Sequence, residues 1–299
     1  MKVSIALITC RRPHSLARLL ASLETLETSA TVELVVIDND PAHSARSITE
    51  NYNGRFPLIA VQEPTPGIPY ARNAALRACS ADTDFIAFLD DDEVVTPSWL
   101  SHMLRAITVT KADAIGGPVE PLYPEGAPRW AITGKYFARE NWPNHQLRPV
   151  LITNNCLIRA TSLRRDNLWF DTRLQFTGSS DTLFFKTAHR KGWQLSWAAD
   201  ALVHEHVPQQ RLTSAWIIQR QYRIGNGLAL CDILLMGRAR ALPLRLAKAA
   251  AYFAKGCAWL PFSPLKGRAT LARSLGTLSA LWGYRYEEYH PDRLVIETP

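Results

Sequence analysis

The chain has 299 residues, of which 47% are hydrophobic, so it is long enough for one large domain or two small ones with a buried core. The 34 Lys and Arg residues against 27 Asp and Glu give a net charge of +7, which predicts attraction to nucleic acid, a phospholipid surface or phosphate-bearing substrates. The composition is that of an ordinary globular protein, and the absence of internal repeats and low-complexity segments excludes repeat architectures.

The cysteines and the apolar runs bear on the environment of the protein. The five cysteines are scattered, with no CxxC pair and no metal-ligand spacing, which predicts a reducing, cytosolic environment. The apolar run from Val3 to Cys10 is short for a signal-peptide core and ends in Arg11 and Arg12, so we interpret it as a first strand. No uninterrupted stretch of about 18 apolar residues occurs, which predicts that there is no transmembrane helix.

Strands and helices alternate through the first 110 residues. Segments with apolar residues at helical spacing begin at Pro13, Tyr70 and Trp99. Apolar runs of strand length lie at 3–9, 32–37, 57–62 and 85–89. This alternation predicts an open, mostly parallel α/β sheet whose ligands bind beyond the carboxyl ends of the strands. No GxGxxG follows the first strand, which disfavours a dinucleotide-binding fold.

An acidic cluster directly follows the fourth apolar run. Asp90, Asp91, Asp92 and Glu93 would repel one another, and a divalent cation is the simplest means of keeping them ionised together. In an extended segment Asp90 and Asp92 share one face while Asp91 points away. Paired carboxylates suit Mg²⁺ or Mn²⁺, ions that leave positions for substrate phosphates. The alternative is an acidic helix N-terminus capped by Thr96, which explains Glu93 but not the aspartate triplet.

The second half of the chain is predicted to contain three more strands and a helical C-terminal region. The strands are expected at 114–119, 150–158 and 193–203, and a long helix at 212–236, interrupted at Gly225-Asn226-Gly227. We expect one domain over 1–236 and a C-terminal helical region over 237–299. In that region basic residues interrupt the apolar ones too often for a bilayer span. The pattern fits either an amphipathic helix in a membrane interface or helices packed on the core.

Five motifs, taken in order, resemble family 2 glycosyltransferases, the inverting sugar-nucleotide enzymes with a GT-A fold. They are SIALITCRRP, VVIDND, GIPYARNAAL, FLDDDE and GSSDTLFF. Their order and spacing carry the resemblance, which covers about residues 1–230. The later segment ALVHEHVPQQRL and the basic helix after it resemble the bacterial exopolysaccharide branch, the succinoglycan-type β-glucosyltransferases.

The resemblance implies a set of nucleotide-binding residues. Thr9 and Arg11 would border the nucleotide, Asp38 and Asn39 would meet the base, and Arg72 would approach the ribose or the diphosphate. The family usually has Asp-Asp where this chain has Asp38-Asn39, so the base contact of Asn39 departs from the family pattern.

The resemblance also implies a metal site and a catalytic base. In the DxD element Asp90 would contact the ribose and, with Asp92, bind the Mg²⁺ or Mn²⁺ that bridges the two phosphates. His204 or His206, at a strand end, is a candidate for a further metal ligand or for binding the diphosphate, and His204 is favoured. Asp181 would be the base that takes the proton of the acceptor hydroxyl as its oxygen attacks the anomeric carbon. The family often has Glu-Asp where this chain has Ser180-Asp181, and the alternative for Asp181 is a helix N-cap.

The expected function is therefore that of a hexosyltransferase. It would move glucose from UDP-glucose to a polyprenyl-diphosphate-linked oligosaccharide in exopolysaccharide or cell-surface polysaccharide biosynthesis. With a basic, amphipathic C-terminal region, we expect it to be peripheral at the cytoplasmic face of the cell membrane.

Two other classes of function are weighed against this one. A nucleotidyl or phosphoryl transferase would be favoured by a glycine-rich, lysine-containing phosphate loop, and none is present. A nucleic-acid-binding protein is suggested by the charge alone and has no need of the aspartates, so we expect no nucleic-acid partner.

Overall fold

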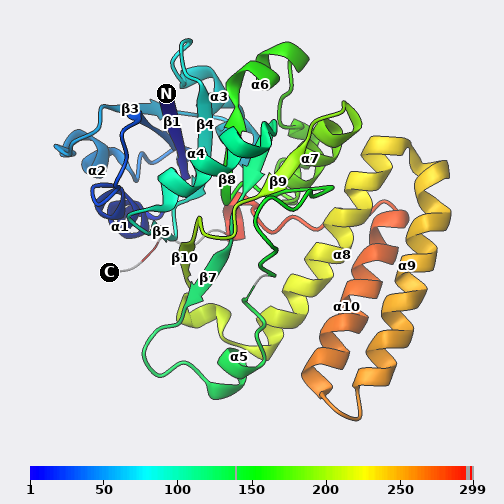
Figure 1. Ribbon diagram of the computed structural model, residues 1–299. Helices are drawn as coiled ribbons and strands as arrows, with labels where there is room; N and C mark the ends of the chain where they lie inside the picture. Colours follow the sequence, from blue (N-terminus) through cyan, green and yellow to red (C-terminus); the bar gives the residue numbers. More distant parts are fainter. Residues whose placement is uncertain (139, 294–296, 298–299) are drawn as a thin grey trace.

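The computed structural model describes residues 1–138, 140–293 and 297. Its centre is a seven-stranded sheet with the order β3-β2-β1-β4-β8-β6-β9 (Figure 1). Strands β1 to β4 are parallel, β8 is antiparallel to β4 and β6, and β9 is parallel to β6. The strands are β1 (Lys2–Thr9), β2 (Thr31–Asp38), β3 (Leu58–Gln62), β4 (Phe85–Asp90), β6 (Ala114–Gly116), β8 (Asn155–Arg159) and β9 (Leu195–Trp197). The predicted α/β class with a mostly parallel sheet is confirmed.

Helices cover both faces of this sheet. α1 (Pro13–Leu23) and α3 (Ile68–Ala78) each have a proline in the first turn, where the missing N–H leaves no hydrogen bond unmade. The other helices of this part are α2 (Arg46–Glu50), α4 (Trp99–Thr110), α5 (Arg129–Thr133), α6 (Ala160–Asp166) and α7 (Ser180–Arg190). Short 3-10 helices lie at Thr172–Leu174, Gln209–Arg211 and Pro291–Arg293. The predicted alternation of strands and helices in the first 110 residues is confirmed.

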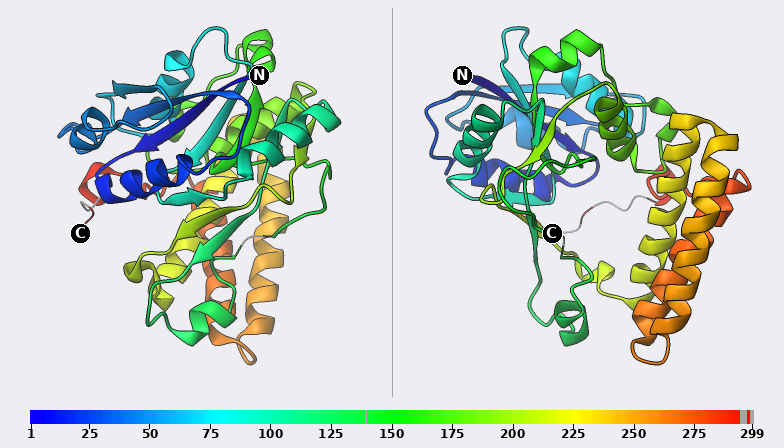
Figure 2. Two further views of the ribbon diagram at one scale, coloured as in Figure 1. Left: turned by 60° about the vertical axis from the view of Figure 1, so that its left-hand side comes forward. Right: turned by 45° about the vertical axis from the view of Figure 1, so that its right-hand side comes forward.

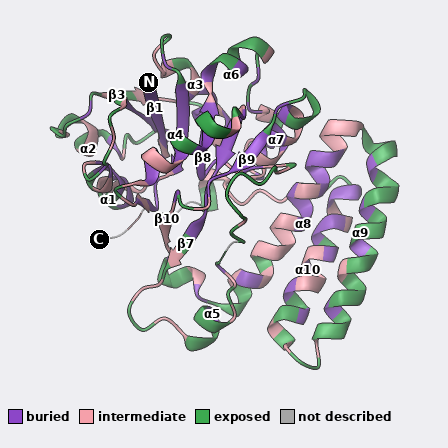
Figure 3. Ribbon diagram, in the orientation of Figure 1, coloured by how far each residue is buried: buried purple, intermediate pink, exposed green. Residues whose placement is uncertain are grey.

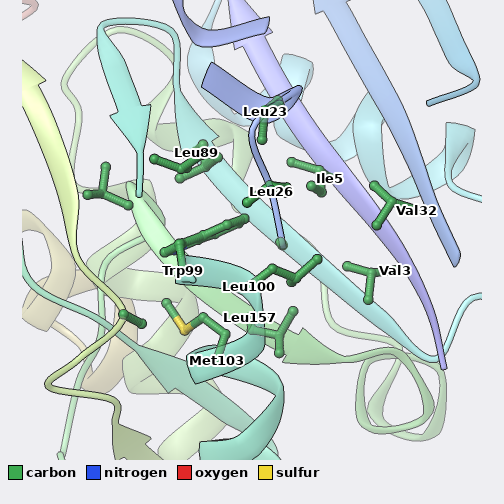
Figure 4. Packing of buried hydrophobic residues seen from close by; sticks show 14 of the residues in the cluster. Val3, Ile5, Leu23, Leu26, Val32, Leu89, Trp99, Leu100, Met103 and Leu157 are labelled. Atoms are coloured by element: carbon green, nitrogen blue, oxygen red, sulfur yellow. The ribbon is translucent and has the colours of Figure 1, made fainter. Parts of the chain in front are cut away.

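The two faces of the sheet carry separate hydrophobic cores. Successive side chains of β1 alternate between them: Val3, Ile5 and Leu7 pack with α1 and α4, whereas Ala6 packs on the other side with α3 and α7. Figure 4 shows the first core, in which Trp99 and Met103 of α4 meet residues of β1, β4 and β8. This three-layer packing fixes the sheet and thereby the edge at which its parallel strands end.

Two predicted strands are each broken in two. Residues 114–119 form β6 and the start of β7 (Val119–Leu122), and residues 193–203 form β9 and the start of β10 (Val203–His206). The two segments between the strand halves lie in close contact: a Cβ on Gly117 would lie only 2.6 Å from the carbonyl oxygen of Ala201. β7 and β10 therefore leave the central sheet and join β5 (Glu93–Val95) in a small sheet of order β5-β10-β7.

Three long helices follow as a bundle (Figure 1, Figure 2). They are α8 (Ser214–Met236), α9 (Arg238–Trp259) and α10 (Pro264–Leu281). The predicted helical C-terminal region is thus present, but the interruption predicted at 225–227 is wrong. α8 continues through it because the glycines permit close helix packing: a Cβ on Gly225 would lie 2.1 Å from the carbonyl oxygen of Arg273 on α10.

The bundle has a packed inner side and an exposed outer side. α9 buries Ala241, Arg245, Ala249 and Gly256, while most of its other side chains are exposed (Figure 3). No helix in the described part of the chain is long and apolar enough to cross a membrane. The predicted boundary at residue 236 coincides with the end of α8. Because α8 itself packs along α9 and α10, the division into 1–236 and 237–299 stays a prediction.

The α8–α10 contact yields a stability prediction. A Cβ on Gly276 would lie 1.9 Å from the carbonyl oxygen of Tyr222, a backbone atom that cannot rotate away. We expect Gly276→Ala to lower the free energy of unfolding by about 1–3 kcal/mol, as overpacking does, measured by urea denaturation. Gly256→Ala is the matched control, because its nearest contact is the Leu271 side chain, which can shift. An equally small loss in both variants would contradict the prediction.

Candidate active site

The predicted site residues of β1, β2 and β4 meet at one edge of the sheet. In the parallel register Thr9 lies opposite Asp38, and Asp90 lies opposite Ile8. Each of the three strands therefore ends at the same level, with polar side chains beyond its last apolar residue. The structure thus brings Thr9, Asp38 and Asp90 together, as expected for ligand binding beyond the carboxyl ends of parallel strands.

Asp91 and Asp92 form a turn between β4 and β5 and are clamped by arginines. The carboxylate of Asp91 is buried, and it accepts hydrogen bonds from Thr9 Oγ1 at 2.8 Å and Arg12 Nη1 at 2.9 Å. Arg12 Nη1 also lies 3.2 Å from Asp92 Oδ2, and Arg211 Nη2 approaches the same oxygen at 3.4 Å. The alternation expected for an extended segment is wrong here, because the turn directs Asp91 and Asp92 to the same guanidinium.

Asp90 is the accessible carboxylate of this group, with 47% of its side chain exposed. Its backbone N–H donates to Oε2 of Glu93 at 2.8 Å, and Asn154 donates to the other oxygen of Glu93 at 3.0 Å. Burial, reinforced by the charges of Asp90 and Asp92, raises the pKa of Glu93 well above its usual value. Glu93 therefore fixes the acidic turn through its hydrogen bonds with the backbone of Asp90 and the side chain of Asn154.

Arg72 joins the acidic turn to α7. One terminal nitrogen lies 3.9 Å from Asp90 Oδ1, and the other donates to Ser180 Oγ at 2.9 Å. Its Nε is buried and has no hydrogen-bond acceptor in the described part of the chain. The guanidinium thus spans the space between β4 and the start of α7.

Asp181 lies in the first turn of α7, directly after Ser180. Its Oδ1 accepts the N–H of Thr182 at 2.6 Å, and its side chain is partly exposed. The N-cap position belongs to Ser179 in a left-handed conformation (φ 62°), so the N-cap alternative for Asp181 is wrong. Arg72 therefore lies between Asp90 and Ser180, the residue directly before the predicted base.

Asp38 and Asn39 hold loops in this structure. The buried Asp38 carboxylate accepts the N–H groups of Asp40 at 3.0 Å and Ala45 at 2.9 Å. The Asn39 amide donates to the carbonyl oxygens of Glu63 and Thr65 and accepts the N–H of Gly67. These bonds shape the wall beside Thr9, and the contact of either side chain with a base stays a prediction.

Arg11 lies between the end of β1 and a C-terminal segment that the sequence did not place here. Its Nε is 3.4 Å from Asp40 Oδ1, and its Nη1 donates to the carbonyl oxygen of Pro291 at 3.3 Å. The segment after α10 crosses from the bundle to the central domain (Figure 2), and Tyr289 N–H donates to the carbonyl oxygen of Phe176 at 3.0 Å. The C-terminal segment is therefore a wall of the site.

His204 stands apart from the acidic turn. On β10 its neighbour Glu205 contacts Arg211 at 3.2 Å, the arginine that also approaches Asp92. Because strand side chains alternate, His204 lies on the opposite face of β10. Its buried Nδ1 has no hydrogen-bond partner in the residues that the structure describes. Over residues 1–138, 140–293 and 297 no three His, Cys, Asp or Glu side chains form a metal-binding group, so a metal role for His204 stays a prediction.

Comparison with known proteins identifies the family. The family model described as glycosyl transferase family 2 matches residues 4–165, and that of glycosyl transferase family group 2 matches residues 85–283. This chain belongs to glycosyl transferase family 2. It is therefore a glycosyltransferase, the first of the three classes of function weighed from the sequence.

Individual relatives agree with this assignment. The chain is 33% identical to the succinoglycan biosynthesis protein ExoM of Rhizobium meliloti, over 100% of this chain and 98% of ExoM. It is 24% identical to the glycosyltransferase AglE of Haloferax volcanii, over 71% of this chain and 68% of that protein. The solved structure of S. aureus TarS superposes with a TM-score of 0.57 and 17% identity, covering 93% of this chain and 55% of TarS. These likenesses confirm the GT-A type fold.

The arginines of the site were in part missed by the sequence analysis. Arg12 belongs to the same motif as Arg11, but the positive φ of Arg11 (60°) reverses the chain there, and this turn sends Arg12 to the acidic turn. Arg211 is distant in sequence and reaches Asp92 only because β10 pairs with β5. A charge count alone gives no sign of either contact.

Proposed function

We propose that this glycosyltransferase moves a sugar from a UDP-sugar, with glucose as the expected sugar, to a polyprenyl-diphosphate-linked oligosaccharide in exopolysaccharide synthesis, with inversion. The observation that carries the proposal is the span of Arg72 between Asp90 and Ser180, which supports a shared site for Asp90 and the proposed base Asp181, the residue after Ser180. The similarity to ExoM supports polysaccharide biosynthesis. The shared fold of the TarS structures solved with UDP and UDP-GlcNAc supports a UDP-sugar donor.

The donor would lie along the carboxyl edge of the sheet. Thr9, Arg11, Asp38 and Asn39 surround the ends of β1 and β2, where the nucleoside would bind, and Arg72 would face the ribose or the diphosphate. A guanidinium suits phosphate oxygens, because its N–H groups form paired, charge-assisted hydrogen bonds. The buried Nε of Arg72 has no hydrogen-bond partner among the described residues, so an oxygen of the bound donor could accept its N–H.

The donor set of the acidic turn fits Mg²⁺ or Mn²⁺. Asp90 and Asp92 supply carboxylate oxygens, and such ions leave their remaining positions to substrate phosphates and water. His204, whose buried Nδ1 has no hydrogen-bond partner in the described residues, is the proposed further ligand. When bound, the ion would neutralise charge on the departing diphosphate. Arg12 and Arg211 already contact Asp92, so the protein itself orients this carboxylate.

Asp181 would act as the base of the transfer. The acceptor oxygen forms a bond to the anomeric carbon while the bond from that carbon to the UDP oxygen breaks, and the hydroxyl proton passes to the Asp181 carboxylate. Because attack and departure occur on opposite faces of the sugar ring, the product is inverted. Arg72, which lies between Asp90 and the start of α7, would hold the phosphates of the donor.

The outer side of the bundle would lie on the cytoplasmic face of the membrane. Between Asp232 and Glu287 the chain has nine Lys and Arg and no Asp or Glu. Leu242 and Phe253 are exposed on α9, and Phe262 is exposed in the connection between α9 and α10. Apolar side chains mixed with basic ones match an interface rich in anionic lipid, where the acceptor's polyprenyl chain is anchored.

Vesicle binding tests this placement. We expect co-sedimentation with vesicles that contain anionic lipid, weakened by salt because exposed charges are screened, and little with neutral vesicles. The exposed pair Lys248→Glu and Lys255→Glu should reduce binding at least about tenfold, since each basic residue near an anionic surface contributes roughly 1 kcal/mol. The matched control is Arg105→Glu with Lys111→Glu, an exposed pair on and beside α4. Equal loss in both pairs would argue against a bundle-specific surface.

Calorimetry with a panel of nucleotide sugars tests the donor. UDP-, GDP- and dTDP-sugars are titrated with and without Mn²⁺. We expect binding of UDP-glucose that strengthens with the metal. Binding of a GDP- or dTDP-sugar in place of UDP-glucose would overturn the proposed donor, and failure of every nucleotide sugar to bind would overturn the proposed role of the acidic turn.

A further inference from the structure

A buried carboxylate connects α7 to the helical bundle. Asp232 of α8 accepts Lys186 Nζ of α7 at 2.6 Å on Oδ1, and Nε and Nη2 of Arg245 on α9 at 2.7 and 2.5 Å on Oδ2. Only 4% of the Asp232 side chain and 2% of the Arg245 side chain are exposed. One carboxylate thus holds a cation from each neighbouring helix.

The charge of Asp232 is stabilised by its partners. Burial acts to raise the pKa of Asp232, but hydrogen bonds and charges from Lys186 and Arg245 outweigh it and hold the pKa below its usual value. Removing one member leaves buried charge without a partner, whereas replacing the whole group by apolar side chains is often neutral for stability. The buried group of Asp232, Lys186 and Arg245 therefore fixes the relative positions of α7, α8 and α9 more than it adds to the free energy of unfolding.

α8 also contacts the turn that leads into Asp181. The Cys231 thiol, adjacent to Asp232, donates to the carbonyl oxygen of Ser179 at 3.3 Å. A Cβ on Gly227 would lie 2.3 Å from Ser179 Oγ. Ser179 and Gly178 are both left-handed (φ 62° and 73°), a conformation that a serine adopts only when its surroundings hold it. α8 thus fixes α7 at two points, the turn before Asp181 and Lys186 five residues after it.

We propose that Asp232 is a positioning residue for glycosyl transfer. With Lys186 and Arg245 it sets the orientation of α7 against the bundle, and so the distance between Asp181 and the acceptor oxygen. This inference rests on the proposed role of Asp181 as base. It adds that a residue that touches neither donor nor acceptor controls turnover, and that the bundle is part of the catalytic machinery.

Kinetics of two variants in the full chain test the proposal. Asp232→Asn should lower kcat about 10- to 100-fold, the cost of a base misplaced by about 1 Å, and leave the KM for the UDP-sugar and the Kd of UDP within about twofold of wild type. The apolar triple variant Lys186→Met, Asp232→Leu, Arg245→Met should keep its melting temperature, yet show the same loss in kcat and a displaced acid limb of the pH profile. Wild-type kcat and pH profile in the triple variant would overturn the proposal.

A stability control, and a variant to use if the Asp232 variants do not fold, complete the experiment. Glu24→Gln removes a carboxylate that ties Tyr52 and Arg55 to α1, far from α7. It should lower the melting temperature without changing kcat. Should the Asp232 variants not fold, Lys186→Met decides, because its side chain is partly exposed and its loss is tolerated more easily. Unchanged turnover in Lys186→Met would count against positioning.

Comparing Asp181→Asn with the Asp232 variants separates this inference from the proposed function. Wild-type turnover in Asp181→Asn would mean that the proposed base is wrong, whatever the Asp232 variants do. An inactive Asp181→Asn together with fully active Asp232 variants would overturn the positioning role alone.

Discussion

Asp181→Asn is expected to lower kcat by about 10²- to 10⁴-fold, the usual contribution of a general base, without weakening UDP binding. The substitution is isosteric, and the amide oxygen can still accept the N–H of Thr182, so the first turn of α7 is preserved. Only the ability to take a proton is lost. Steady-state transfer rates and calorimetry with UDP measure the two effects.

Asp82→Asn is the matched control for this substitution, since Asp82 is an exposed aspartate paired with Lys2 at the opposite end of the sheet. Its kcat should stay at the wild-type value. If Asp181→Asn retained more than about a tenth of wild-type kcat, well above the range expected for a lost general base, Asp181 would not be the base. The search would then move to another carboxylate near the acidic turn.

Asp92→Ala is expected to weaken Mn²⁺-dependent UDP binding at least about tenfold, or roughly 1.4 kcal/mol, because one of the two proposed ion ligands is removed. The fold should survive the change. Arg12 keeps its hydrogen bond to Asp91, and Arg211 keeps its contact with Glu205, so neither guanidinium is left without a carboxylate. Calorimetric titration of UDP with and without Mn²⁺ measures the effect.

Asp91→Ala is the contrasting variant. Asp91 is buried and satisfies both Thr9 and Arg12, so its removal should lower the melting temperature more than the loss of Asp92 does. Undiminished stimulation of UDP binding by Mn²⁺ in Asp92→Ala would show that the ion binds elsewhere. A melting temperature lowered equally in both variants would show that Asp92 has a structural role.

Much of the fold was predictable from local patterns. Apolar runs at 3–9, 32–37 and 85–89 correspond closely to β1, β2 and β4, because strands covered on both faces need continuous apolar sequence. Helix starts at Pro13 and Trp99 were also placed correctly. The two strands predicted at 114–119 and 193–203 were too long, since periodicity gives no sign that Gly117 and Ala201 pack against each other.

In the candidate site, too, some contacts could be predicted from the sequence and others could not. The strand ends bring Thr9, Asp38 and Asp90 together through register alone, which follows from the order of parallel strands. The contact of Arg72 with Ser180 joins residues 108 positions apart, and no local pattern predicts such a pairing. The roles of these residues toward nucleotide and metal remain predictions to be tested as described above.

The sequence by itself determined the α/β class, the family and the position of the acidic motif after β4, because each depends on short-range order: runs of apolar residues, turn residues and motif spacing. Tertiary structure decided how the acidic motif is used. The turn at Asp91 and Asp92, the arrival of Arg12 and Arg211, the wall formed by the C-terminal segment and the tie from Asp232 to α7 all depend on chain segments that meet only in the packed molecule. Charge and hydrogen bonding act over a few ångströms in space whatever the separation along the chain, so these partners follow from packing rather than from sequence order.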